Sequence, residues 1–248
     1  MPDIPARVQT EICFTSGISS EWIIAGIISA SARFIPIPFL DEIVQNRCRR
    51  FAVKTTIEAH SVDLDLITLE PYCSSPSGCF VGCLGMILRL PINLLLFPFR
   101  KIIAVATSFR AVPLEIMRVY LLGRTLDRYL ANGSFGQSEN SLRIDDRAYA
   151  TRMRFAFDQS FSRMDMHVVL SAIQDATGGF RELTTAAFVG LKSVFARNNK
   201  SATAFVSKSG SGVKAEASKL QESFSQAEMV VLFEKFDLRF DNAMKDSD

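Results

Sequence analysis

The sequence is poor in the residues that most often build catalytic and metal sites. It holds two histidines, five cysteines and one tryptophan among 248 residues. The cysteines match no zinc spacing, and with no signal-like N-terminal stretch they do not form a disulfide framework. No G-x-x-x-x-G-K-[ST] loop occurs, which removes the basis for inferring nucleotide hydrolysis. No segment alternates polar and apolar residues over any length, so we expect no β-strand.

Other absences bear on location and partners. Residues 1–20 lack a basic stretch followed by an apolar core, because Asp3 and Glu11 interrupt them. We therefore expect the chain in the cytoplasm or at the inner face of the membrane. The basic residues are interleaved with long aliphatic runs rather than clustered on a polar face, so we expect no nucleic-acid partner. No carboxylate pair or cysteine–base pair stands out, and we expect no enzyme, no cofactor and no metal; an enzyme assembled from distant residues is the third alternative.

Apolar residues are abundant and concentrated in one place. They make up 48% of the chain, and twenty phenylalanines suit a dry core or a contact with acyl chains. The longest apolar stretch is 78–110, which Pro91 and Pro98 divide and which carries Arg89 and Asn93 near its middle. Three structures fit it, in decreasing order of preference: a buried helical core with an exposed membrane-facing patch, a kinked hairpin entering one leaflet, and a true span.

Charge in the same block is of one sign. Between residues 73 and 125 there are six basic residues and a single acid, Glu115. Apolar and basic residues together favour an anionic membrane surface, although arginines at the wet ends of buried helices would give the same pattern. We predict that the membrane contact consists of Arg89, Leu94, Leu95, Leu96, Phe97, Phe99, Arg100, Lys101, Ile102 and Ile103.

Two helices are predicted before this block. The first, over 22–32, is apolar or small on nearly every face, and residues such as Gly26 and Ser29 would permit close helix approach. Pro36 and Pro38 then end it and set the start of an amphipathic helix of about twenty residues. Its apolar positions are Leu40, Ile43, Val44, Cys48, Phe51 and Ala52, and its solvated positions are Arg47, Arg49, Arg50 and Lys54.

This arrangement resembles a known kind of helical domain. A short apolar helix, the run Ile-Pro-Ile-Pro-Phe-x-Asp at 35–41 and a basic amphipathic helix are similar to the helical domain of unknown function behind bacterial GTPase domains, the YcjF-like group. The segment also resembles EcsC-like proteins, which have a hydrophobic helical build and a link to membranes. The likeness covers about residues 20–70 and supplies no catalytic residues.

The remaining chain predicts further helices. One follows Arg110 with Pro113 in its first turn, and a polar loop from Asn132 to Asn140 ends it. Amphipathic helices are expected over 144–176, 180–197 and 213–244. The His60-x-x-Asp63-x-Asp65 and Asp165-x-His167 groupings are assigned to helix surfaces and helix ends rather than to metal or catalytic sites.

Together these features predict an all-α protein, an irregular multi-helix bundle around a central kinked hydrophobic segment. Residues 1–131 form a hydrophobic, basic region and 141–248 an amphipathic region packing on it, in one composite domain. We expect a non-enzymatic membrane-associated anchor or scaffold that contacts anionic lipid. The alternative is a soluble module that binds other proteins or itself through the apolar segment.

Overall fold

The computed structural model describes residues 16–32, 40–74, 97–133, 135, 143–177 and 210–246, and for 97–110 it describes the helical backbone. These residues form eight helices and no strand, so the predicted all-α bundle is confirmed. The helices are α2 (Ser16–Ser31), α3 (Leu40–His60), α4 (Glu70–Cys73), α7 (Phe97–Ala131), α8 (Arg143–Ser162), α9 (Met166–Thr177), α12 (Gly210–Phe224) and α13 (Ala227–Lys245).

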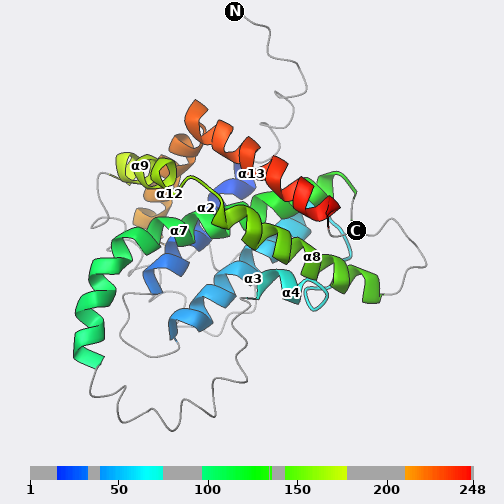
Figure 1. The fold of residues 1–248 in the computed structure, drawn as a ribbon, viewed down its shortest axis with the longest axis horizontal. Coiled ribbons are helices and arrows are strands. Elements are labelled where there is room, and N and C mark those ends of the chain that lie inside the picture. The colour runs from blue at the N-terminus through cyan, green and yellow to red at the C-terminus, as the bar shows by residue number, and fades with distance from the viewer. Residues whose placement is uncertain are drawn as a thin grey trace, which may run out of the picture.

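Helix α7 is the axis of the bundle. Its C-terminal half packs against α2, α3 and α9, while α8 packs against α4 and α13 (Figure 1). From residue 112 onward most of α7 is buried, because its apolar residues recur on every side of the helix rather than on one stripe. Elements from both ends of the chain therefore surround the same helix.

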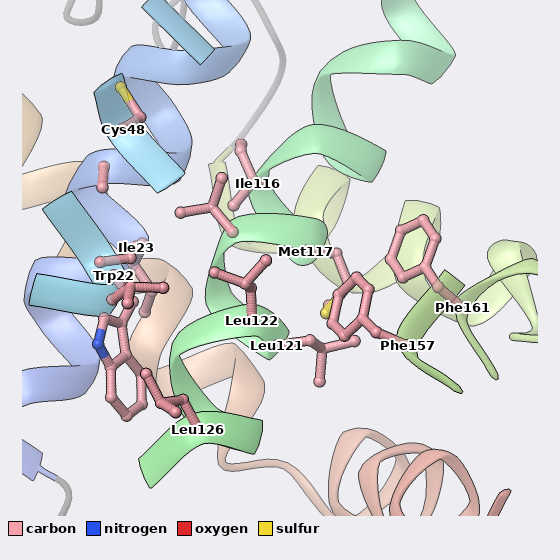
Figure 2. Packing of buried hydrophobic residues seen from close by; sticks show 14 of the residues in the cluster. Trp22, Ile23, Cys48, Ile116, Met117, Leu121, Leu122, Leu126, Phe157 and Phe161 are labelled. Carbon is pink, nitrogen blue, oxygen red and sulfur yellow. The ribbon is translucent and has the colours of Figure 1, made fainter. Parts of the chain in front are cut away.

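The core fills the space between α7 and its neighbours. Figure 2 shows Trp22 and Ile23 of α2 on one side of α7, and Phe157 and Phe161 of α8 on the other. Phe157 lies 5.6 Å from Phe236 in an edge-to-face contact and 5.9 Å from Phe161 in a stacked one, measured between ring centroids. Such aromatic pairs bury large apolar areas in preferred geometries. Some of the phenylalanine surplus is thus placed in a dry core.

Two glycines allow helices to approach α7 closely. A Cβ added at Gly26 of α2 would lie 3.0 Å from the backbone of Ile116. At Gly123 of α7, an added Cβ would lie 2.6 Å from the ring of Trp22. The indole is fully buried and donates through Nε1 to the Thr56 hydroxyl at 3.0 Å, which fixes it in place. The predicted close approach of α2 through small residues is confirmed.

Helix α3 agrees with its predicted start and length, but two of its residues differ from the prediction. Its 21 residues begin at Leu40, with Asp41 and Glu42 in the first turn. Ile43, expected in the apolar stripe, is 48% exposed, and Arg49, expected in solvent, is 2% exposed. The expected solvent position was wrong for Arg49 because a distant residue neutralises it inside the core.

Helix α7 is longer than predicted. A new helix was expected to begin after Arg110, with Pro113 in its first turn, yet one helix of 35 residues runs from Phe97 through Pro113 to Ala131. Pro98 lies in its first turn, where proline is tolerated. Pro113 lacks the N–H that would bond to the carbonyl of residue 109, so this is the point where a bend is expected. Figure 1 shows α7 changing direction between its projecting and packed halves.

The C-terminal helices follow the prediction with one added break. Helices α8 and α9 cover the expected 144–176, and the Asp165 carboxylate caps α9 by accepting from the His167 backbone N–H at 3.0 Å. The single helix expected over 213–244 is instead α12 and α13, separated at Ser225 and Gln226. The helix expected over 180–197 lies outside the described residues.

Candidate functional site

The predicted membrane-contact residues fall in two groups. Arg89, Leu94, Leu95 and Leu96 lie outside the described residues. Phe97, Phe99, Arg100, Lys101, Ile102 and Ile103 form the first two turns of α7. Figure 1 shows this end of α7 extending beyond the other described helices, at the edge opposite the C-terminal end of α13. The structure thus places the second group on a projecting helix.

The helical backbone turns this sequence into a two-faced segment. Positions three, four and seven apart share a helix face, which groups Phe99, Ile102, Ile103 and Ala106 together. Arg100 and Lys101 occupy positions on the other side of the same turns. Arg110, four positions after Ala106, falls on the apolar face at the end of the segment. In the first turns, apolar and basic positions are on different sides, a pattern typical of segments that lie at a membrane interface.

Where α7 enters the bundle, it carries a buried ion pair. Arg49 Nη2 of α3 donates to Glu115 Oε1 at 3.0 Å, and both side chains are 2% exposed. The Ser29 hydroxyl of α2 donates to the same oxygen at 2.8 Å. Three helices therefore meet at one carboxylate, two residues from Pro113. The pair fixes α7 to α2 and α3 just beyond its projecting half.

Glu115 makes the stability of the fold depend on pH in the acid range. Burial alone would raise the pKa of Glu115, but Arg49, Ser29 and Arg118 outweigh burial and hold the pKa below its ordinary value. A group whose folded pKa is depressed stabilises the protein above its unfolded pKa, about 4.3 for Glu. That stability is lost as the pH falls through the folded pKa.

The loss of stability at low pH can be measured directly. We expect the double variant Arg49→Met/Glu115→Leu, which lacks both charges, to lose less stability than the wild-type chain as the pH falls below about 4. Urea unfolding followed by Trp22 fluorescence at several pH values gives the two curves. Curves that stay parallel over the whole range would contradict the assigned role of Glu115.

Other charged residues of α7 bind neighbouring helices. Arg124 pairs with Asp237 at 2.7 Å, and Arg128 pairs with Asp241 at 2.6 Å, both on α13. His60, at the end of α3, lies 2.7 Å from the Asp127 carboxylate. His60 thus contacts α7 rather than Asp63 or Asp65. No cluster of three or more metal-ligating side chains occurs among the described residues.

The described thiols are unsuited to nucleophilic chemistry. Cys48 and Cys73 are buried and free. Burial raises the pKa of Cys73 to about 12 and raises that of Cys48 further. Because the thiolate is the reactive form, neither residue is a nucleophile near neutral pH. Cys79 and Cys83 lie outside the described residues.

The buried pair was not predicted, although the amino-acid sequence contains one signal for it. Glu115 is the single acid between residues 73 and 125. An isolated carboxylate in an apolar helix has to find a cation when it is buried, since an unpaired buried charge is costly. The partner, Arg49, gave no local signal, because its position in α3 fits the solvated face.

Comparison with known proteins adds no relative: no family model, no curated protein and no solved structure matches the chain. Among the described residues, no helix combines the length and apolar character needed to cross a bilayer.

Proposed function

We propose that this chain is a non-enzymatic, membrane-associated helical protein that acts as an anchor or scaffold at an anionic lipid surface, on the cytoplasmic side. The observation that supports it most is the projecting half of α7, a helical segment that extends beyond the bundle and carries the sequence FPFRKIIAVATSFR. The resemblance of residues 20–70 to EcsC-like and YcjF-like helical proteins favours the same function.

The size of the segment suits a helix lying in the interface. Residues 97–110 amount to roughly 21 Å of helix at 1.5 Å per residue, which is shorter than the hydrocarbon core of a bilayer, about 30 Å thick. Phe99, Ile102 and Ile103 would enter the acyl boundary, and Arg100 and Lys101 would face anionic headgroups. The Arg49–Glu115 pair holds the other half of α7 in the folded bundle, so the segment is presented on a rigid support.

Charge reversal in the projecting segment tests the proposal. We expect Arg100→Glu/Lys101→Glu to weaken binding to anionic liposomes by at least about 30-fold, since each basic residue near such a surface contributes about 1 kcal/mol. Flotation with phosphatidylserine-containing vesicles measures the bound fraction. Binding of the wild-type chain should also fall with added salt, because screening shortens the range of the attraction.

The matched control is Arg147→Glu/Lys245→Glu. Both residues are exposed, and they belong to α8 and α13 rather than to the projecting half of α7. This variant has the same net charge as the test variant and should float like the wild-type chain. A wild-type chain that stays at the bottom at every lipid composition refutes the proposal. If it is also monodisperse without detergent, the soluble interaction module is favoured.

A further inference from the structure

Helix α13 exposes apolar side chains on its outer face. Val230, Val231 and Leu238 are 40%, 47% and 64% exposed, and all three belong to this one helix. Val231 and Leu238 are seven residues apart, so they occupy the same face two turns from each other. Figure 1 shows α13 along one edge of the molecule. Exposed apolar residues that share a face mark a contact surface more often than isolated ones do.

A groove runs beside this face. It has a volume of about 750 Å³ and lies between α13 and the turn that joins α8 to α9. Its buried floor is apolar and consists of Met164, Leu232 and Phe236, while Val231 forms part of the wall. Lys235 lines the same groove. The exposed side chain of Leu238 belongs to the same helix but does not itself line the groove.

We infer that α13 binds α13 of a second copy of this chain in a symmetric, antiparallel contact. A two-fold axis between Glu234 and Lys235 places Val231 opposite the partner's Leu238, and Glu234 opposite the partner's Lys235. Each relation occurs twice, as an interface with two-fold symmetry requires. Leu238 of one copy then lies beside the groove of the other.

Charge complementarity favours a second copy over another partner. Glu234 and Lys235 are both exposed, and neither makes an ion pair with another described residue. An acidic peptide would be repelled by Glu234 and Glu228, and a basic one by Lys235 and Arg239. A second copy in the antiparallel register meets opposite charges at both central positions. Opposite charges across a contact fix register and exclude other partners.

The contact leaves the proposed membrane segment free. The projecting half of α7 and α13 lie at different edges of the molecule (Figure 1). Dimer formation and lipid binding are therefore separate properties, and either one can hold without the other.

Sedimentation velocity of the purified full-length chain over a range of concentrations tests the inference. We expect the wild-type mass to rise with concentration and level off at twice the 27.6 kDa of one chain. Leu238→Glu should sediment as a monomer throughout, because a carboxylate would be forced against the apolar groove. A wild-type chain that stays monomeric, or a mass that rises past the dimer without levelling off, overturns the inference.

Exchange of the two central charges tests the register. Glu234→Lys and Lys235→Glu should each weaken the dimer, by roughly tenfold, because each replaces two attractive pairs with two repulsive ones. The double variant Glu234→Lys/Lys235→Glu should regain the wild-type dissociation constant, since opposite charges meet again.

Phe155→Glu on α8 is the control for the Leu238 variant. Phe155 is 65% exposed, close to the 64% of Leu238, but it does not line the groove. This variant should dimerise normally. Far-UV circular dichroism of every variant shows whether the fold is retained, so that loss of dimer is separated from unfolding. A double charge exchange that fails to restore the dimer while the fold is intact rules out this antiparallel register.

Discussion

Replacement of Glu115 by alanine is expected to lower the free energy of unfolding by about 3–5 kcal/mol. The substitution removes a carboxylate that is 2% exposed and leaves the equally buried guanidinium of Arg49 without its counterion. It also removes the acceptor of the Ser29 hydroxyl. An uncompensated buried charge costs far more than the lost hydrogen bonds alone, because the guanidinium has already given up its hydration. Urea unfolding followed by the fluorescence of the single tryptophan gives the value.

Two further variants show whether the loss of stability is specific to a buried charge left without its counterion. Glu70 pairs with Arg50 at 2.6 Å, but the two side chains are 42% and 55% exposed, so Glu70→Ala should cost no more than about 1 kcal/mol. Arg49→Met/Glu115→Leu removes both charges and should recover most of the stability lost in Glu115→Ala. Two nitrogens of Arg49, Nε and Nη1, have no hydrogen-bond partner among the described residues, which favours this recovery. If Glu115→Ala costs as little as Glu70→Ala, the pair does not hold α7 in place.

The N-terminal helices were predictable because their signals are local. Small residues such as Gly26 predicted the close packing of α2, and the Pro36–Pro38 pair with Asp41 predicted where α3 begins. The proline signal acts through the backbone conformation of a few adjacent residues. Gly26 acts through its missing side chain, which lets α2 lie against the backbone of Ile116, but its small size is visible in the sequence without knowledge of that partner.

Arg49 was misassigned because its burial depends on a residue 66 positions away. Helical periodicity identifies the side of a helix that is rich in polar residues, and Arg49 fits that side. It carries no information about a carboxylate arriving from another helix.

The apolar and basic composition of the candidate site was predictable from the sequence, but its helical structure was not. The apolar, basic character of 78–110 is visible in the sequence, whereas one helix running through Pro113 was not expected. A proline in a helix interior costs about 3 kcal/mol locally. Burial of Ile116, Met117 and the turns that follow offsets this cost, and that burial exists only after α2 and α3 have packed on α7. Local rules therefore predicted a break at a position that tertiary packing keeps helical.

Replacement of Gly123 by alanine is expected to destabilise the fold, although helix propensity alone predicts the opposite. Alanine is better than glycine in a helix interior by about 1 kcal/mol. At Gly123, however, the new Cβ would lie 2.6 Å from three atoms of the Trp22 indole. The indole is fully buried and held by Thr56, so it has no free space into which to move. Overpacking of this kind costs about 1–3 kcal/mol. Over most of that range the cost is larger than the gain in helix propensity.

Gly17 provides the matched control, because it lies in the first turn of α2 and an added Cβ there meets no atom within 4 Å. Gly17→Ala should be neutral or slightly stabilising, so the two substitutions are expected to differ in sign. The double variant Gly123→Ala/Trp22→Phe should be more stable than the sum of the two single effects predicts, since the smaller ring leaves room for the methyl group. Thermal unfolding followed by circular dichroism compares these four variants with the wild-type chain, because Trp22→Phe removes the fluorescent reporter. Equal stabilisation by both alanines would mean that α2 and α7 do not pack as closely as the Gly123–Trp22 contact requires.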